Sequence, residues 1–544
     1  MFNSHRRWAL TPMALLVGLP LACVLVCQSA LAAAFSPQAS DLRSIAAAQT
    51  ASRVGSPPAD QMMHLVVSLP LRNAQQLDSL LQAIYDPRSP QYRRFLSVAE
   101  FTDRFGPSAA DYDNALAFFE HRGFVAGPRA ANRYLVALDG KVSDVERVFH
   151  VTMGLYKHPT EDRNFISPDR APTFDLDTPI QEVLGLDDFM LPHNKMAHAK
   201  VERSAGGSGP HGNFIGSDIR TAYYPTGGLT GQGQSVGLME LEGVNLSDVA
   251  LFFASNYGAA NSVDIQLIAT DSEPVTCTGR CTDGEQALDI EYTISMAPGL
   301  SSVRVYVGSS PEDVLNAMAS DNISKVLSTS WGWRENATDN GLFAEFAAQG
   351  QTNLTASGDD STLTASGPWP EEARDIVAVG GTDLHTATPG GPWSKETGWA
   401  DSAGGPSVNP NIHIESYQLP YINSANGGST TLRNVPDIAA SADTDMTICA
   451  DGSCAGGWGG TSFASPIWAG FIALANEAAL SEGKSVVGFI NPRIYALGHD
   501  AGYSDWFHDI TVGKSGIYNC VPSYDLVTGL GSPQGQALIT HLIE

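Results

Sequence analysis

A run of small residues followed by a long apolar segment is the feature that most constrains how this chain of 544 residues can fold. The run reads Gly459-Gly460-Thr461-Ser462-Phe463-Ala464-Ser465-Pro466. The apolar spacing after it predicts a helix over residues 467–480, with Ser462 near its start. There, free backbone N–H groups and the helix dipole would stabilise an oxyanion that develops beside the Ser462 hydroxyl. An ordinary Thr/Ser helix cap with glycines in the turn has the same pattern, so both interpretations stand at this point.

The length and the charge distribution indicate at least two parts. Chains beyond roughly 250 to 300 residues divide into domains, and 43% hydrophobic with 16% charged residues excludes a disordered chain or a simple coiled coil. Residues 1–200 hold 20 acidic and 19 basic side chains, whereas the remainder holds 38 and 12. A field this negative excludes nucleic acid and anionic membranes as partners of the second part. It also favours an acidic working pH, although a merely soluble secreted protein explains the charge equally well.

The N-terminus has the pattern of a signal peptide. Arg6 and Arg7 precede an apolar run over residues 13–26, and small residues follow at 30–32, so we expect residues 1–32 to be cleaved. The run is shorter than the ~18 to 20 apolar residues of a membrane anchor. The sequence therefore predicts a secreted, extracellular protein, with the periplasm as a place of transit or residence, and no membrane partner.

Five cysteines follow the predicted signal peptide. The close spacings favour local disulfide bridges between Cys277 and Cys281 and between Cys449 and Cys454, which leaves Cys520 over. A zinc site is the less favoured alternative, because no histidine follows at the spacing of a zinc finger.

Residues 57–189 alternate between strand and helix patterns. Strands are predicted over 64–69 and 134–138, and helices over 74–85, 111–122 and 142–149. This alternation is typical of an α+β ferredoxin-like sandwich.

The second part follows a stretch without hydrophobic period. Residues 192–212 are rich in His, Lys, Ser and Gly, and we expect an exposed linker of the kind that proteases cut. Apolar strands are then predicted over 235–240, 303–307 and 326–330, with helical segments between them. Such strands indicate an α/β fold whose parallel sheet is covered by helices on both faces.

Two carboxylates four residues apart are candidates for proton transfer. Glu285 and Asp289 belong to a segment with helical spacing, so both would project from one face of a helix. In a cleft, such a pair shares protons, and one member can act as a general base at acidic pH. On a solvated face the same pair would cost only a few tenths of a kcal/mol and have no function.

The motifs together resemble the sedolisin (kumamolisin-like, serine-carboxyl) peptidases with their pro-kumamolisin activation domain. Ser-Pro-Gln-Tyr at 89–92, Phe-Leu-Ser at 95–97 and Phe-Thr-Asp-Arg-Phe-Gly-Pro at 101–107 are similar to the activation prodomain. Gly-Thr-Ser-x-x-x-Pro is the serine signature that subtilisins and sedolisins share, but the chain lacks the His-Gly-Thr-His segment of a subtilisin. The segment 284–291, with Ala-Pro-Gly at 297–299, matches the Glu/Asp motif of the sedolisins.

The resemblance implies a role for each site residue. Ser462 would be the nucleophile, Glu285 its base, Asp289 the residue that orients Glu285, and Asp359 the donor to the oxyanion. The family usually reads Gly-Asp-Ser-Gly at the last position, whereas this chain reads Gly-Asp-Asp-Ser at 358–361, so Asp360 is the alternative to Asp359. The segment 328–332 resembles the substrate-cleft strand of the family, and Glu240 falls where some members have a supporting acid.

The resemblance also implies one structural calcium ion near the C-terminus. Its ligands would be the side chains of Asp509 and Asp525 and the carbonyl groups of Ile510, Val521 and Ser523. Val521 and Ser523 stand where the family usually has glycine. Without the resemblance, two aspartates that cap their own turns would be the simpler interpretation.

These expectations define one organisation and one function. We expect a signal peptide (1–32), an activation prodomain (33–191), an activation linker (192–212) and a subtilisin-like peptidase domain (213–544). The function expected is that of a secreted, monomeric endopeptidase for protein and peptide substrates, active at acidic pH and inhibited by its own prodomain until it processes itself. A tripeptidyl-peptidase and a catalytically silent, calcium-stabilised binding protein are the alternatives.

Overall fold

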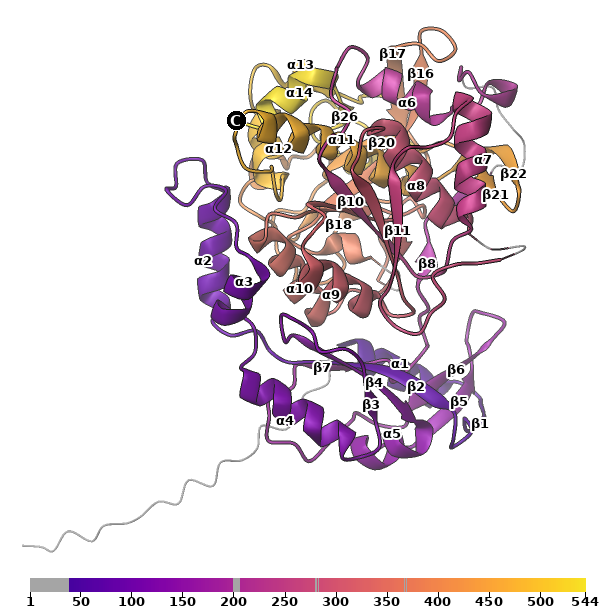
Figure 1. The fold of residues 1–544 in the computed structure, drawn as a ribbon, viewed down its shortest axis with the longest axis vertical. Coiled ribbons are helices and arrows are strands. Elements are labelled where there is room, and N and C mark those ends of the chain that lie inside the picture. Colours follow the sequence, from indigo (N-terminus) through magenta and orange to yellow (C-terminus); the bar gives the residue numbers. More distant parts are fainter. Residues whose placement is uncertain (1–38, 199–205, 279–280, 282, 366, 368) are drawn as a thin grey trace, which may run out of the picture. The chain divides into compact units, whose positions relative to one another are not determined.

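The computed structural model describes residues 39–198, 206–278, 281, 283–365, 367 and 369–544. All of them belong to one compact unit, Phe35–Glu544. The predicted signal peptide lies outside the described residues. Figure 1 draws the N-terminal elements in indigo and purple and the remainder from magenta to yellow.

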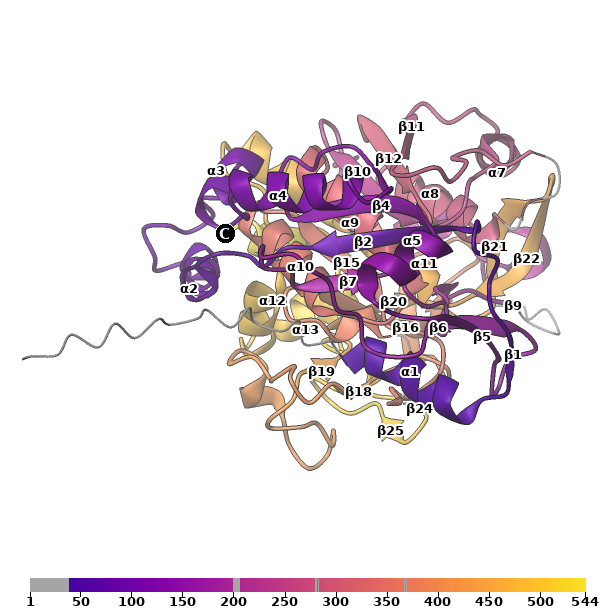
Figure 2. The same cartoon turned by 90° about the horizontal axis from the view of Figure 1, so that it is seen from below.

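A four-stranded antiparallel sheet organises the N-terminal part. Its strand order is β3-β4-β2-β7, with β2 at Met62–Ser68, β3 at Val125–Ala126, β4 at Leu135–Lys141 and β7 at Glu182–Leu184. The strands that come first and third in the chain are central, as in the ferredoxin-like fold predicted from the sequence. Helices α4 (Ala109–Glu120) and α5 (Val142–Phe149) lie in front of the strands in Figure 2.

Both faces of this sheet are buried, because alternate residues of β2 point to opposite sides. Leu65 and Val67 belong to the apolar cluster that includes α4 and α5. Val66 instead belongs to a cluster with residues of α9 (Pro311–Asp321) and α10 (Ala337–Ala348), which are helices of the C-terminal part. The prodomain sheet therefore packs directly on these two helices.

Two further helices of the N-terminal part also contact the C-terminal part. Helices α2 (Ala74–Tyr85) and α3 (Val98–Arg104) share an apolar cluster with Ala344 and Ala348 of α10. Helix α3 begins with a capping box between Ser97 and Glu100. The remaining elements here are α1 (Ala39–Thr50) and an antiparallel sheet of β1 (Arg53–Gly55), β5 (Met153–Lys157) and β6 (Asn164–Pro168).

An eight-stranded sheet is the centre of the C-terminal part. Its order is β11-β12-β10-β13-β15-β16-β17, and β20 also pairs with β16. All of its pairings are parallel except that of β16 with β17. The strands are β10 (Ser235–Glu240), β11 (Asp264–Ala269), β12 (Ser302–Val307), β13 (Val326–Thr329), β15 (Thr352–Ala356), β16 (Val377–Thr386), β17 (Trp393–Gly398) and β20 (Ile438–Ser441). The three predicted strands are confirmed to within one residue at each end.

Helices cover both faces of this sheet, as predicted. Val236 and Leu238 of β10 pack in the cluster that contains α8 (Gly284–Met296) and α11 (Thr461–Ser481). Met239, which points the other way, packs in the cluster of α9 and α10. Among the described residues, α11 has the length and composition of a membrane span, yet it is buried in the core of this part of the protein. The fold is the α/β architecture that the sequence predicts, with a parallel sheet covered by helices on both faces.

Short elements complete the C-terminal part around this sheet. They are β14 (Trp331–Gly332), β18 (Gly405–Pro406), β19 (Asn434–Val435), β21 (Met446–Ala450), β22 (Ser453–Gly459), β23 (Phe507–His508), β24 (Lys514–Ser515), β25 (Tyr518–Asn519), β26 (Ser532–Pro533), α6 (Gly216–Tyr223), α7 (Leu246–Tyr257), α12 (Asn491–Gly498), α13 (Tyr503–Trp506) and α14 (Gly535–Leu542).

The segment predicted as an exposed linker begins inside the fold. β8 (His193–Asn194) pairs with β14, and β9 (Ala197–His198) pairs with β22. Lys195, between these two short strands, is buried. The expected exposure is therefore wrong at Lys195, because pairing with distant strands buries a segment that has no hydrophobic period of its own. Residues 199–205 of the predicted linker lie outside the described residues.

Candidate active site

Ser462 is the second residue of α11, and its side chain is buried. Gly460, two residues before Ser462, has a φ of 122°, a conformation that favours glycine. A Cβ atom on Gly460 would lie 2.3 Å from Lys195 O and 2.7 Å from Asp359 Oδ2. Gly460 is required because these two oxygen atoms converge on the space beside it. The simple cap interpretation is not supported, because the N-cap residue of α11 is Gly460 and neither Thr461 nor Ser462 is in the cap position.

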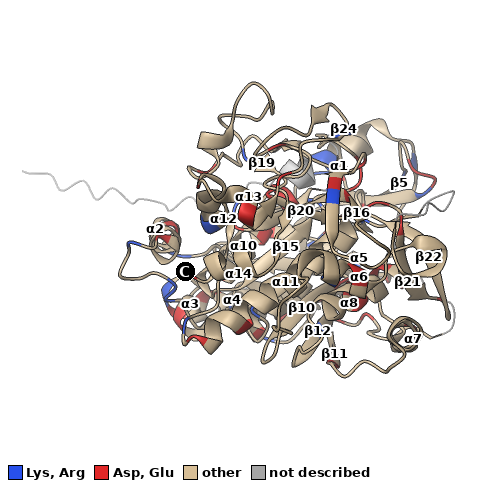
Figure 3. Cartoon of the chain, turned by 90° about the horizontal axis from the view of Figure 1, so that it is seen from above, with Lys and Arg blue, Asp and Glu red and all other residues tan. Residues whose placement is uncertain are grey.

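Glu285 and Asp289 lie one turn apart on α8, and the structure buries both completely. Figure 3 shows the red acidic residues on this helix. Burial raises the pKa of Glu285 well above its usual range, and the charge of Asp289 raises it further. The Ser462 hydroxyl lies close enough to lower this pKa through hydrogen bonding, although neither group makes a hydrogen bond of standard geometry with a described residue. The solvated-face interpretation of the pair is therefore excluded.

Asp289 is part of a buried row of acids. Ser330 Oγ donates to Asp289 Oδ1 at 2.8 Å and also lies 3.2 Å from Ser462 O. Burial raises the pKa of Asp289 to about 8, and Glu240 lies close enough to lower this pKa through hydrogen bonding. Burial also raises the pKa of Glu240 well above its usual range, and the charge of Asp289 raises it further. Trp331 Nε1 donates a hydrogen bond to Glu240 Oε2 at 3.0 Å. The three acids are thus neighbours that share protons.

Asp359 lies on the other side of Ser462, at the end of β15. Its Oδ1 accepts hydrogen bonds from Thr461 N (2.9 Å) and Thr461 Oγ1 (2.8 Å). Its Oδ2 is buried without a partner among the described residues. Burial raises the pKa of Asp359 to about 7, so below that pH Oδ2 carries a proton that it can donate. Asp360, the alternative from the sequence, is exposed to solvent.

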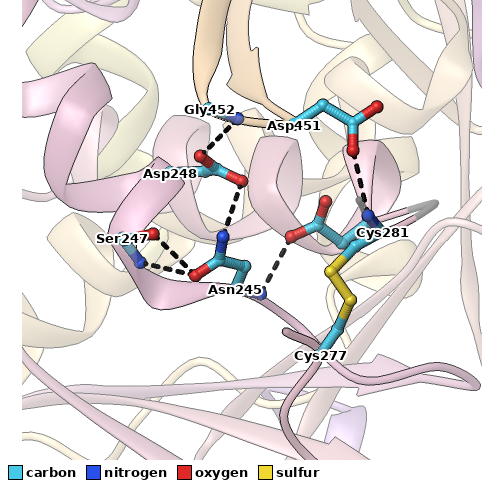
Figure 4. Close-up of a disulfide and its surroundings, with 8 residues drawn as sticks. Asn245, Ser247, Asp248, Cys277, Cys281, Asp451 and Gly452 are labelled. Atoms are coloured by element: carbon cyan, nitrogen blue, oxygen red, sulfur yellow. Dashed lines mark hydrogen bonds between the residues drawn. A yellow bond between two sulfur atoms is a disulfide. The ribbon is translucent and has the colours of Figure 1, made fainter. Parts of the chain in front are cut away.

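A disulfide loop holds the start of α8. Figure 4 shows the bridge between Cys277 and Cys281, with Cys281 N donating to Asp451 Oδ1 at 2.9 Å. Asp283, which precedes α8, accepts a hydrogen bond from Asn245 N at 2.8 Å. Asp451 belongs to the turn between β21 and β22. These contacts tie the helix that carries Glu285 to the strand that leads into Ser462.

The cysteines pair as the sequence predicts. Cys449 and Cys454 form the second disulfide, across the turn between β21 and β22, and Cys520 is free and buried.

Asp509 and Asp525 lie in neighbouring loops near the C-terminus. Asp509 accepts hydrogen bonds from Ser523 N at 3.0 and 3.2 Å. Asp525 accepts from the backbone N–H groups of Val521, Val527 and Thr528. Burial raises the pKa of Asp525 to about 7, which a bound cation would reverse. Ser523 has a φ of 69°, so it adopts a conformation that favours glycine. Two carboxylates held by loop amides suit a hard cation such as calcium.

Two contributors to the site were missed by the sequence analysis. Lys195 Nζ donates to Glu371 Oε2 at 2.8 Å and to Ala356 O at 2.6 Å. Glu371 belongs to a short 3-10 helix at Pro370–Glu372. Neither residue lies in a recognisable motif, and the two are far apart in the sequence. The sequence offered one indication only: Lys195 lies within residues 192–212, the segment that we expected to be a linker cut by proteases.

The chain is similar to peptidases over most of its length. Residues 49–189 match the family described as pro-kumamolisin, activation domain, and residues 300–489 match the subtilase family. Kumamolisin from Bacillus sp. (strain MN-32) is 29% identical over 89% of this chain and 92% of that protein. Sedolisin from Pseudomonas sp. (strain 101) is 29% identical over 87% of this chain and 86% of that protein.

A solved structure and a further relative extend these comparisons. The structure of Pseudomonas sedolisin complexed with two molecules of pseudo-iodotyrostatin gives a TM-score of 0.53 at 27% identity, and covers 62% of this chain and 99% of that chain. Human tripeptidyl-peptidase 1 is 25% identical over 89% of this chain and 92% of that protein.

Proposed function

The chain belongs to the sedolisin family of serine-type peptidases, and from that premise we propose that it is a secreted endopeptidase, active at acidic pH and made as a self-processing zymogen. One observation carries this proposal. Two distant parts of the sequence, α8 with Glu285 and Asp289 and the segment after β15 with Asp359, bring three acids close to the buried Ser462 at the start of α11.

The proposed reaction begins with attack of Ser462 Oγ on the carbonyl carbon of a peptide bond. Glu285 accepts the hydroxyl proton and returns it to the nitrogen of the leaving group. Asp289, held by Ser330, is a positioning residue that keeps the acid pair in place. The Ser462 N–H group and protonated Asp359 donate to the oxyanion of the tetrahedral intermediate.

An acidic working pH follows from the protonation that these roles need. Asp359 can donate to the oxyanion only while it is protonated, which its pKa of about 7 allows below neutrality. Burial likewise lets Glu240 and Asp289 keep protons that exposed carboxylates would have lost, whereas Glu285 accepts the Ser462 proton in its ionised form. The negative charge of residues 201–544 is also smaller at low pH.

The prodomain is proposed to inhibit the enzyme until it is removed. Its Glu182 accepts hydrogen bonds from Thr338 N (2.7 Å) and Thr338 Oγ1 (2.6 Å) at the start of α10. Residues 193–198 run past Ser462 between β14 and β22 and would exclude a substrate.

We further propose one structural calcium ion, a secreted location and a monomeric state. Asp509 and Asp525 would bind the ion through their carboxylates, and Ile510, Val521 and Ser523 through their carbonyl groups, which would fix the loops around β23 and β26. Residues 1–32 support export, because they combine two arginines, an apolar run and small residues.

The test is replacement of Ser462 in the full-length precursor. We expect Ser462→Ala to accumulate uncleaved precursor and to lose peptidase activity at acidic pH, measured by intact mass and hydrolysis of a denatured protein. Ser465→Ala is the matched control. Ser465 lies on the same helix as Ser462, but its hydroxyl contacts Ser328 Oγ of β13, at 2.8 Å. Normal maturation with full activity in Ser462→Ala would reject the proposal.

A tripeptidyl-peptidase is the second candidate, because relatives with that name align with most of the chain. An assay with N-terminally blocked peptides distinguishes an endopeptidase from a tripeptidyl-peptidase. An endopeptidase cleaves blocked and free peptides at the same internal bond, whereas a tripeptidyl-peptidase requires the free N-terminus and releases three residues.

A further inference from the structure

The segment that contains Lys195 crosses the site in an extended conformation, with a strand on each side. Before Lys195, β8 pairs antiparallel with β14, so that His193 lies opposite Gly332. After Lys195, β9 pairs antiparallel with β22, so that Ala197 lies opposite Gly459. The bond between Lys195 and Met196 is therefore the part of the segment that lies beside Ser462.

The carbonyl group of Lys195 occupies the position that an oxyanion would take. Its oxygen accepts a hydrogen bond from Ser462 N at 3.3 Å, and Lys195 N donates to Ser330 O at 2.9 Å. The same oxygen and Asp359 Oδ2 converge on the space beside Gly460. The two proposed oxyanion donors thus face one specific carbonyl group of the chain.

The side chain of the residue after this carbonyl reaches the start of α8, the helix that carries the proposed base. A Cβ atom on Gly284, the neighbour of Glu285, would lie 3.0 Å from Met196 Cε. The Met196 side chain therefore extends toward the start of α8. His198, two residues on, contacts Trp458 with 4.3 Å between ring centroids and an angle of 54° between the rings.

The side chain of Lys195 is buried against an acid. Its side chain is 2% exposed and that of Glu371 is 0% exposed, and Nζ lies 2.8 Å from Glu371 Oε2. Ala356 O accepts a second hydrogen bond from Nζ at 2.6 Å. An apolar side chain at this point would leave the buried oxygen atoms of Glu371 and Ala356 without the hydrogen-bond donor that Nζ supplies, so such a side chain would be rejected here.

We propose that the bond between Lys195 and Met196 is the first bond that the precursor cleaves in itself, and that Glu371 selects lysine as the residue before the cut in other substrates. The inference rests on the proposed function, and it adds the bond and the substrate class to it. Peptides and protein segments with an accessible lysine are the substrates expected.

The cleavage is an ordinary hydrolysis with water as the second reactant. Ser462 Oγ bonds to the Lys195 carbonyl carbon as its proton passes to Glu285. The C–N bond to Met196 then breaks, and the proton moves to the Met196 nitrogen. Water hydrolyses the acyl-enzyme, which releases the Lys195 carboxylate and restores the Ser462 hydroxyl.

The first experiment follows the purified full-length precursor after acidification by intact mass and terminal sequencing. We expect the earliest fragments to end at Lys195 and to begin at Met196. Lys195→Met should slow this cut by about tenfold or more, because Glu371 and Ala356 lose their buried hydrogen-bond donor. Lys195→Arg should restore part of the rate, and Lys200→Met, a nearby lysine, should process like the wild type. A first cut at another bond would overturn the inference.

The second experiment compares kcat/KM of the mature enzyme on matched peptides. The peptides carry lysine, norleucine or glutamate before the scissile bond. We expect the lysine peptide to have the highest kcat/KM, and Glu371→Gln to lower it roughly 100-fold with little change for norleucine. Equal losses on both peptides would indicate damage to the fold and would reject the role of Glu371.

The outcomes separate this inference from the proposed function. If wild-type enzyme cleaves norleucine and lysine peptides equally well, the function stands and the lysine selectivity is rejected, whether or not Glu371→Gln folds. If Ser462→Ala still matures, the proposed function itself is rejected.

Discussion

At the scale of single residues, the site depends on a carboxyl group that must be neutral. Asp359 Oδ1 is held by Thr461, so Oδ2 alone faces the Lys195 carbonyl oxygen beside Gly460. A carboxylate at this point would repel the oxyanion, whereas a carboxylic acid stabilises it. The pKa of about 7 therefore sets the upper pH limit of this contribution.

Asp359→Asn tests this role, because an amide donates a hydrogen bond at every pH. The contribution of Asp359 is present below about pH 7 and is lost as the pH rises through that value. We expect the variant to keep more of its maximal kcat at pH 7 than the wild type does. Asp359→Ala should lower kcat by about 10² to 10³ below about pH 7, where the wild type has the protonated donor. Profiles of kcat against pH measure both effects, with Asp360→Asn as the control. Identical profiles for wild type and Asp359→Asn would contradict the role.

At the scale of elements, loops near the C-terminus are expected to depend on calcium. Removing the ion leaves Asp525 buried without a cation, so we expect a chelator to lower the melting temperature by several degrees. Added calcium should restore it, and magnesium should not, because the loop supplies several carbonyl ligands in an irregular arrangement. Asp525→Asn should remove this dependence, whereas Asp505→Asn, which lies outside the proposed ligands, should retain it. A melting temperature that does not respond to chelation would reject the site.

The contact between the prodomain and α10 is a second prediction at this scale. Glu182 binds the first N–H groups of α10, and burial raises its pKa. We expect Glu182→Ala to weaken the bound prodomain by about 1 kcal/mol or more, so that peptidase activity appears sooner after acidification. Continuous assay of the acidified precursor measures this, with the exposed Glu161→Ala as the control. An unchanged lag would contradict it.

The elements also define what a sequence can predict. The predicted helices over 74–85 and 142–149 coincide with α2 and α5, because their apolar residues repeat at helical spacing. Glu285 and Asp289 were placed correctly on one helix face for the same reason. The short strands β8 and β9 were missed, since two residues have no period, and the burial of Lys195 depends on strands more than 130 residues away. The packing of α2 and α3 against α10 could not be predicted either, because no local sequence pattern indicates which helices will pack together.

At the scale of the whole molecule, the acidic composition has a consequence for stability. Burial raises the pKa of Asp289 and of Glu345 to about 8 and that of Asp359 to about 7. In the unfolded chain these groups titrate near pH 4. Between those values the folded protein binds more protons than the unfolded chain, so its stability falls as the pH rises. The negative charge of residues 201–544 acts in the same direction, because exposed carboxylates repel one another once ionised.

The two causes can be separated with salt. We expect the melting temperature of the Ser462→Ala precursor, which does not digest itself, to fall by roughly 5 °C or more between pH 4.5 and pH 8. About 1 M NaCl shortens the Debye length to roughly 3 Å and screens repulsion between exposed charges, but it leaves the protonation of buried acids unaffected. A fall that persists in salt therefore measures the buried acids, and Glu345→Gln should reduce it. A melting temperature that rises with pH would contradict the raised pKa values, and with them the argument that this protein is built to work in acid.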